Sequence, residues 1–221
     1  MNSQIIKLVL ESTGQTLEMV FFSTIFSVIL GLPLGVLLHV TDKEEKGGII
    51  PKPVLNEVLS RIVNVLRSFP FLILMIVLIP LTRLILGTSI GTKAAVVSLS
   101  IAAAPFVARV IETSLIEVDP GVIQAAKAMG STNWQIIWKV MLPEALPSLV
   151  SGITLTIINL ISYSAMAGTI GGGGLGDLAI RYGYQRFRTD VMVAAVIVTV
   201  VLVELIQFAG NRIASALLKK R

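Results

Sequence analysis

The segment Asp119–Pro147, DPGVIQAAKAMGSTNWQIIWKVMLPEALP, is polar and rich in helix-capping residues, whereas the chain around it is typical of a membrane protein. Of the 221 residues, 54% are hydrophobic and 14% are charged, and the mean hydropathy is +0.87. Soluble domains carry roughly 25% charged residues. A two-helix hairpin of soluble character in such a chain indicates that something outside the membrane binds it.

The first helix of this segment is bounded by two strong signals. Asp119 can cap the first free N–H groups of a helix, and Pro120 suits its first turn. Gly130 can adopt a positive φ and so end the helix. We therefore expect a helix over 120–128.

The second helix is expected over 133–141. Thr132, with Gln135 three residues later, fits a capping box, and Leu142-Pro143 is expected to end the helix. Spacing alone leaves two interpretations: an amphipathic hairpin held in the lipid headgroups by its tryptophans, or a surface for a partner protein. Apolar residues at helical spacing predict one apolar face: Trp134, Ile137, Trp138 and Met141.

Apolar runs elsewhere reach the roughly 18–20 residues that a helix needs to cross a bilayer. The expected fold is all-α, a polytopic membrane protein with five transmembrane helices. No polar stretch is long enough to form a separate soluble domain, so residues 1–221 are expected to form one transmembrane domain that includes the hairpin 119–143. Helix breakers occur at Gly31–Gly35, and Pro70 is expected to kink the second span. The five spans are expected at 17–40, 61–81, 92–112, 148–169 and 190–211.

The distribution of positive charge predicts the orientation. With the N-terminus outside, 12 of the 18 Lys and Arg residues, Lys220 and Arg221 among them, fall on the inner side and 6 on the outer side. Inner loops of membrane proteins carry such an excess, so we expect N-out, C-in, with the hairpin in the cytoplasm. The net charge of +5 then indicates contact with the lipid bilayer and not with nucleic acid.

Composition argues against metal and nucleotide chemistry in this chain. Cysteine is absent and His39 is the single histidine, so neither a catalytic nor a metal site is expected. Gly171, Gly173 and Gly176 satisfy G-x-G-x-x-G, but no strand precedes them and no G-K-[ST] is present. A flexible turn that allows close backbone approach is the favoured interpretation, and no cofactor is expected.

Three polar features near the spans each have two interpretations. Glu204 in the fifth span is either a carboxyl group bonded to a neighbouring helix or an ion-coupled site. The loop Arg181–Arg188 either anchors in headgroups or docks a binding protein. The fourth span carries a stripe that either joins helices or lines a translocation path: Gly152, Thr156, Asn159, Tyr163 and Met166.

The hairpin resembles the EAA loop of bacterial ABC importer permeases. The resemblance rests on Gln124-Ala125-Ala126, on Gly130 four residues after Ala126, and on Leu142-Pro143. Gln124 stands where the family usually has Glu, which weakens a charge contact to the ATPase or replaces it with a neutral hydrogen bond. Further segments are similar to permease subunits of bacterial methionine importers: 31–41, 64–75, 79–91, 103–109, 142–150, 163–176 and 206–213.

This resemblance implies a type I ABC importer permease in the bacterial cytoplasmic membrane. It implies a homodimer, two cytoplasmic ATP-binding subunits and an external methionine-binding lipoprotein. The chain itself is then not an enzyme, because ATP hydrolysis belongs to the partner. The residues expected at the ATPase interface are Gln124, Ala125, Ala126, Gly130 and Trp134.

The expected function is that of the channel-forming subunit for ATP-driven uptake of methionine, in the L form or in both forms. Three alternatives stay open. The same architecture can import another amino acid or an osmolyte, the chain can be an ion-driven secondary transporter that uses Glu204, or it can be a scaffold without transport activity.

Overall fold

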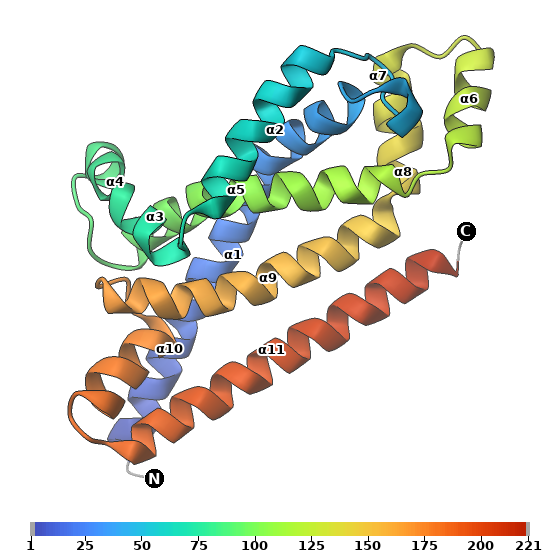
Figure 1. Ribbon diagram of the computed structural model, residues 1–221. Helices are drawn as coiled ribbons and strands as arrows, with labels where there is room; N and C mark the ends of the chain where they lie inside the picture. The colour runs from blue at the N-terminus through green and yellow to red at the C-terminus, as the bar shows by residue number, and fades with distance from the viewer. Residues whose placement is uncertain (1–2, 220–221) are drawn as a thin grey trace. The chain divides into compact units, whose positions relative to one another are not determined.

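The computed structural model describes residues 3–219, and within that range every regular element is a helix (Figure 1). Lys220 and Arg221, counted above among the inner charges, lie outside the described residues. The chain divides into two compact units, each assembled from three separate stretches. Unit 1 contains the described residues of Met1–Ser27, Phe69–Ala103 and Thr156–Phe208, and unit 2 those of Val28–Ser68, Ala104–Leu155 and Ala209–Arg221.

Four described helices are long and apolar enough to cross a membrane, and a fifth span is counted if the segment around Pro70 forms one. They agree with the first, third, fourth and fifth expected spans, although the first helix begins well before residue 17. All four contribute residues to both units. These helices are α1 (Ser3–Val40), α5 (Thr92–Ile116), α9 (Leu146–Thr169) and α11 (Thr189–Leu218).

The expected second span is broken rather than kinked. The chain forms α2 (Pro53–Ser68), α3 (Phe71–Val77) and α4 (Ile79–Leu86) in place of one helix over 61–81. Pro70 has a ψ of 128°, far from helical values, and caps α3. Proline disfavours helical geometry in the residue before it and lacks an N–H group, so the interruption here ends α2 outright.

Unit 2 is built on the close approach of α1 and α5. A Cβ atom on Gly31 would lie 2.7 Å from the Val107 Cβ, and one on Gly35 would lie 2.5 Å from the Ala108 carbonyl oxygen. The segment Gly31–Gly35 is tolerated within the first span, as expected, because α1 continues through Pro33 without interruption, and its glycines serve in packing. Small residues at helix interfaces of membrane proteins permit this approach.

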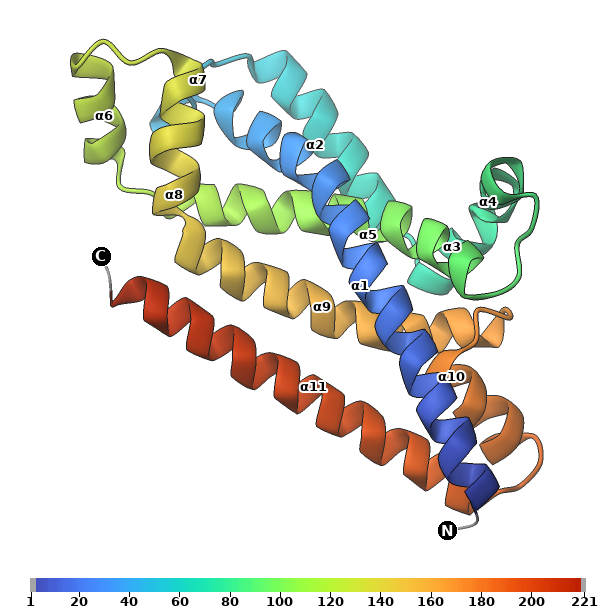
Figure 2. The ribbon, with the colours of Figure 1, turned by 180° about the vertical axis from the view of Figure 1, so that it is seen from behind.

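Unit 1 is closed by a backbone contact between α9 and the short helix α10 (Gly174–Asp177). A Cβ atom on Gly176 would lie 2.2 Å from the Ala165 Cα, so only glycine fits there. Side chains of α1 cap α10, because Gly174 N–H donates to Gln15 Oε1 at 2.8 Å. Figures 1 and 2 both show α10 beside the N-terminal part of α1.

Candidate functional site

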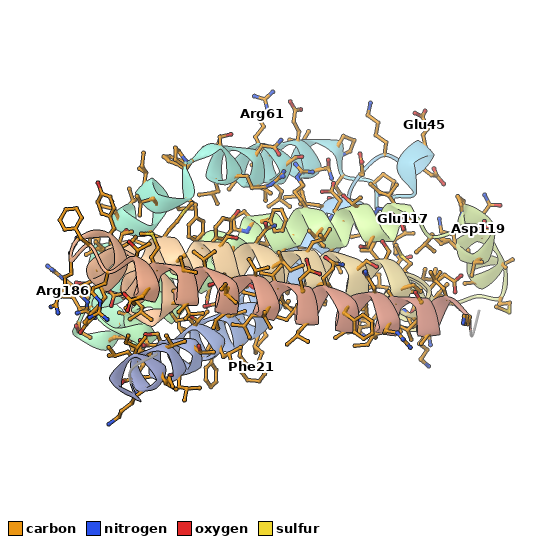
Figure 3. The ribbon with its side chains drawn as sticks, turned by 90° about the horizontal axis from the view of Figure 1, so that it is seen from below. Phe21, Glu45, Arg61, Glu117, Asp119 and Arg186 are labelled. Atoms are coloured by element: carbon orange, nitrogen blue, oxygen red, sulfur yellow. The ribbon has the colours of Figure 1, made fainter. Side chains whose placement is uncertain are left out.

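The first helix of the hairpin, α6, spans Pro120–Ala128, as expected from the sequence. Gly121 N–H donates to Asp119 Oδ1 at 2.7 Å, and Pro120 occupies the first turn. Figure 3 shows Asp119 at the start of this helix. The cap leaves few free N–H groups, so α6 can persist at a surface.

The turn at Gly130 ends α6 in a Schellman arrangement. Gly130 has a φ of +79°, its N–H donates to the Lys127 carbonyl at 3.0 Å, and Ser131 N–H donates to the Ala126 carbonyl at 3.1 Å. These two bonds are the pair expected for a glycine that follows a helix in the left-handed conformation. The prediction that Gly130 adopts a positive φ and ends the first helix is confirmed.

The second helix begins as expected but does not end at Leu142-Pro143. α7 (Asn133–Ile136) starts with the predicted capping box, in which Gln135 N–H donates to Thr132 Oγ1 at 3.3 Å and Thr132 N–H donates to Gln135 Oε1 at 2.9 Å. The chain continues through a π-helical turn, Ile137–Met141, into α8 (Leu142–Glu144). The proline sits in the first turn of α8, where its missing N–H costs little.

The expected apolar face of this helix is divided between two surfaces. Ile137 and Met141 are buried in unit 2, whereas the Trp134 and Trp138 side chains are 68% and 46% exposed. The two indole rings contact each other, with centroids 5.3 Å apart. A π-helical turn holds more residues than an α-helical turn, which shifts later side chains around the axis relative to α-helical spacing. The prediction of a single face was therefore wrong, and the tryptophans form an exposed apolar patch.

The hairpin is anchored to the core of unit 2. Ile123 and Ala126 from α6 and Ile136 from α7 belong to the same buried cluster as Val107 and Ile111 of α5. Figures 1 and 2 both show α6 alongside α7 and α8. A force applied to the hairpin is therefore transmitted to the helices of unit 2 through packed side chains, not through a flexible loop.

The residues predicted to contact a partner differ in exposure. Gln124, Ala125, Gly130 and Trp134 are exposed, but Ala126 is only 3% exposed and packs in the core. A partner can therefore touch the first four directly. The Ala126 side chain instead allows α6 to approach the core closely.

The polar stripe of α9 is not uniformly accessible. Thr156 is 1% exposed and Asn159 is half-buried, whereas Met166 is 42% exposed. The Tyr163 ring stacks on Phe71 of α3, with centroids 3.8 Å apart and planes 11° apart. Sequence spacing did not predict this stack, since its two rings lie more than 90 positions apart in the chain.

The glycine-rich segment after α9 forms tight turns, with positive φ at Gly171, Gly173 and Gly174. The sequence interpretation of close backbone approach is correct, as the contact between Gly176 and Ala165 shows.

The segment Arg181–Arg188, expected to be a loop, begins within a π-helical stretch, Leu178–Tyr184, and presents arginine and aromatic side chains. The Arg186 guanidinium lies over the Tyr182 ring, 4.5 Å from its centroid, and Phe187 is 88% exposed. Arg188 donates to Asp190, and this hydrogen bond raises the pKa of Arg188 above its ordinary value. Figure 3 shows Arg186 in this segment. These contacts suit both lipid headgroups and a protein partner.

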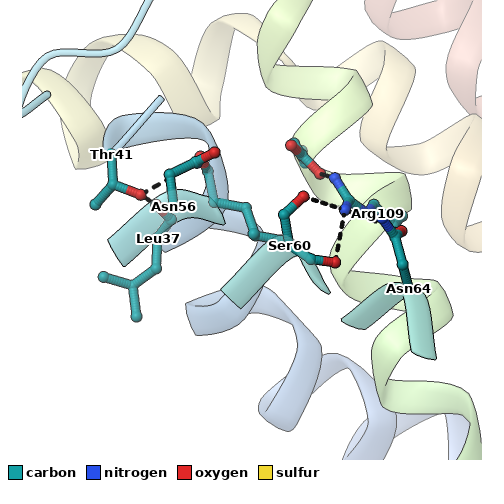
Figure 4. A network of polar contacts seen from close by, with 8 residues as sticks. Leu37, Thr41, Asn56, Ser60, Asn64 and Arg109 are labelled. Carbon is teal, nitrogen blue, oxygen red and sulfur yellow. Dashed lines mark hydrogen bonds and ion pairs between the residues drawn. The ribbon is translucent and has the colours of Figure 1, made fainter. Parts of the chain in front are cut away.

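One polar network in unit 2 was not predicted from the sequence. Arg109 of α5 donates to Glu112 through Nη1 at 2.6 Å, and through Nη2 to Asn64 at 3.0 Å and to the Ser60 carbonyl at 3.2 Å (Figure 4). It ties α5 to α2. From the sequence, Arg109 is only one of the 12 inner charges, because nothing local relates it to residues more than 40 positions away.

Comparison with known proteins identifies the family to which the chain belongs. Residues 31–220 match the family described as binding-protein-dependent transport system inner membrane component. A probable D-methionine transport system permease protein of Vibrio cholerae is 52% identical over 92% of this chain and 89% of its own length. A D-methionine transport system permease protein of Escherichia coli K12 is 48% identical over the full length of both chains.

Solved structures agree with this assignment. A chain of the MetNI methionine ABC transporter in an inward-facing conformation matches with a TM-score of 0.95 and 48% identity, covering 98% of this chain and 99% of that one. An amino acid ABC transporter crystallised with histidines shares the fold, with a TM-score of 0.71 at 20% identity. With a capped surface hairpin, several membrane-crossing helices and this similarity along nearly its whole length, the chain belongs to the family of binding-protein-dependent transport system inner membrane components.

Proposed function

We propose that this chain is the channel-forming permease subunit of an ATP-driven ABC importer that takes up methionine, in the L form or in both forms. The observation that carries the proposal is the hairpin 119–143. It is fixed to the core of unit 2, yet it presents Gln124, Ala125 and Trp134 outward. The similarity to methionine transport permeases along nearly the whole chain supports the choice of cargo.

The hairpin is the proposed site of energy input. An ATP-binding subunit contacts Gln124, Ala125 and Trp134. Gly130 forms the bend of the hairpin, and the small side chain of Ala126 packs α6 against the core. Because Ile123 and Ile136 pack in the same cluster as α5, movement of the hairpin becomes movement of the helices. ATP hydrolysis takes place in the partner subunit, and the chain itself is not an enzyme.

The proposed assembly contains a second copy of this chain, two cytoplasmic ATP-binding subunits and an external methionine-binding lipoprotein in a bacterial cytoplasmic membrane. The orientation is N-out, C-in, and residues 1–221 act as one permease domain. The translocation path is proposed to follow the α9 stripe of Thr156, Asn159, Tyr163 and Met166. Stacking on Phe71 holds Tyr163 in place, so movement of α3 would change the path at that ring.

The test is uptake by the reconstituted complex. The chain is purified with its ATP-binding subunit, placed in liposomes that contain ATP and supplied outside with binding protein and labelled methionine. ATP-dependent accumulation of methionine supports the proposal. Uptake of glycine betaine without methionine would show a different cargo, and gradient-driven uptake by the chain alone would show an ion-driven transporter in which Glu204 is the candidate site.

A matched pair of variants tests the hairpin. Trp134→Ala removes an exposed aromatic side chain that contacts a second ring 5.3 Å away. Phe21→Ala removes a comparable one, since Phe21 of α1 is 61% exposed and its ring centroid lies 5.4 Å from that of Phe22 (Figure 3). We expect Trp134→Ala to weaken ATPase binding at least about tenfold, as for an interface anchor, and Phe21→Ala to leave it unchanged. Equal effects of the two variants on ATPase binding would contradict the proposal that the hairpin forms the interface.

A further inference from the structure

A groove in unit 2 carries two positive side chains of different character. Arg109 is held by Glu112, Ser60 and Asn64, so its guanidinium is fixed in position and its charge is largely matched. Arg67 lies on the same helix as Asn64, three residues further on, and is exposed. Among residues 3–219 no hydrogen bond or ion pair to the Arg67 side chain is found, so this cation is available to a ligand.

Both arginines line one cavity of about 320 Å³, a volume within the ~300–1,000 Å³ range of small-molecule sites. None of the described residues that line it is acidic, so the cavity favours an anionic group. The hydroxyl side chains of its lining are those of Thr113, Ser114, Ser148 and Ser151.

A second cavity, of about 340 Å³, adjoins the first and has acidic side chains in its lining. The two share Ser114, Ser148 and Ser151, and Ser148 Oγ donates to Ser114 Oγ at 3.2 Å. The second cavity adds the carboxyl side chains of Glu117 and Glu144. The groove therefore runs from guanidinium groups, past hydroxyl groups, to carboxyl groups.

This separation of charge matches a small zwitterion. An amino acid carries a carboxylate and an ammonium group a few bonds apart. Its carboxylate can replace bound water with the guanidinium and hydroxyl groups at one end of the groove, and its ammonium group can replace bound water with carboxyl groups at the other end. A planar guanidinium binds a carboxylate through two parallel N–H donors, which an ammonium group cannot do.

We propose that this groove is a binding site for the transported amino acid, in which Arg67 binds the carboxylate and the side of Glu117 attracts the ammonium group. Arg109 is a positioning residue, since its bonds to Ser60 and Asn64 hold α2, and with it Arg67, against α5. The assignment of the ligand rests on the proposed function, whereas the charge pattern of the groove does not.

The absence of cysteine from the chain permits a direct test. Ser151 lines both cavities and is exposed, and its Oγ donates to the Pro147 carbonyl of its own helix, with no other hydrogen bond among residues 3–219. A single Ser151→Cys variant is assembled with its ATP-binding subunit in neutral phosphatidylcholine nanodiscs. The rates of modification by an anionic and a cationic methanethiosulfonate reagent are then compared, with and without methionine.

We expect the anionic reagent to react about fivefold faster than the cationic reagent, relative to their rates with a free thiol. Adding Arg67→Gln should abolish this preference. Adding Arg61→Gln should preserve it, because Arg61 lies on the same helix but pairs with Glu57 and points away from α5 (Figure 3). Methionine should slow modification of Ser151→Cys. Methioninol, which lacks the carboxylate, should not slow it. Adding Arg67→Gln should remove the protection by methionine.

Each of the following results would overturn the proposal: no charge preference, equal protection by methionine and methioninol, or protection that survives Arg67→Gln. Slower modification when phosphatidylglycerol is added to the nanodiscs, without any effect of methionine, would assign the groove to a lipid phosphate and also overturn it. Uptake by the unmodified complex is measured in parallel. Methionine uptake without protection refutes the groove alone, whereas absence of uptake refutes the proposed function.

Discussion

The bend of the hairpin gives the sharpest prediction. Gly130 has a φ of +79°, and a Cβ atom built on it meets nothing within 4 Å. Substitution there therefore introduces backbone strain without steric overlap. For residues other than glycine this conformation costs about 1–3 kcal/mol, with alanine near the lower end and a β-branched residue near the upper end. A cost of about 3 kcal/mol lowers the population of the bent form roughly a hundredfold relative to competing forms.

We therefore expect Gly130→Val to reduce ATP-driven uptake to below about a tenth of wild type, Gly130→Ala to reduce it a few-fold, and Gly130→Asn to stay near wild type. The protein should remain folded, since the core of unit 2 is untouched. Uptake and ATP hydrolysis are measured on the same reconstituted complex, and their ratio reports coupling.

Gly87→Val is the matched control for this experiment. Gly87 also has a positive φ, of +73°, and open space around a built Cβ, but it lies after α4 in unit 1. The same strain at Gly87 should leave the ratio of uptake to hydrolysis unchanged. Wild-type uptake in Gly130→Val, or equal loss of coupling in the two variants, would refute the role of the bend.

Two further predictions concern stability, measured as the midpoint of unfolding of the purified chain in detergent. Glu112→Ala should lower the free energy of unfolding by about 3 kcal/mol, because it leaves the charge of Arg109 without its ion-pair partner. The double variant Arg109→Met with Glu112→Met should recover most of this loss. An unchanged midpoint for Glu112→Ala would contradict the network. Gly176→Ala should cost about 3 kcal/mol or more, since its Cβ would meet the Ala165 Cα at 2.2 Å. Gly14→Ala, which has open space, should cost nothing measurable, and similar midpoints for the two variants would exclude the close backbone contact.

The features that the sequence predicted well are local ones. The cap at Asp119, the positive φ at Gly130 and the capping box at Thr132 each depend on atoms within about five residues, so residue type and spacing are sufficient to infer them. The long helices were predictable for a similar reason, because their apolar composition is a property of each segment by itself.

The features that the sequence did not predict are those that depend on neighbours distant in sequence. Gly31 and Gly35 were expected only to be tolerated within the first span, and their direct packing against α5 was not predicted. Trp134 and Trp138 were expected to share one apolar face with Ile137, but the core of unit 2 buries only Ile137. Helical periodicity predicts which residues share a face, but it does not predict which face another helix will cover.

By itself, then, the sequence determined that this is a helical membrane chain with a capped hairpin bent at a glycine, because those properties follow from composition and short-range hydrogen bonding. Only the tertiary structure decided that Ala126 is buried while Gln124 is exposed, that Tyr163 stacks on Phe71, and that Arg109 is held by α2 and leaves Arg67 available beside it. The physical reason is that burial and ion pairing are set by side chains brought together from distant parts of the chain, and no local pattern specifies that pairing.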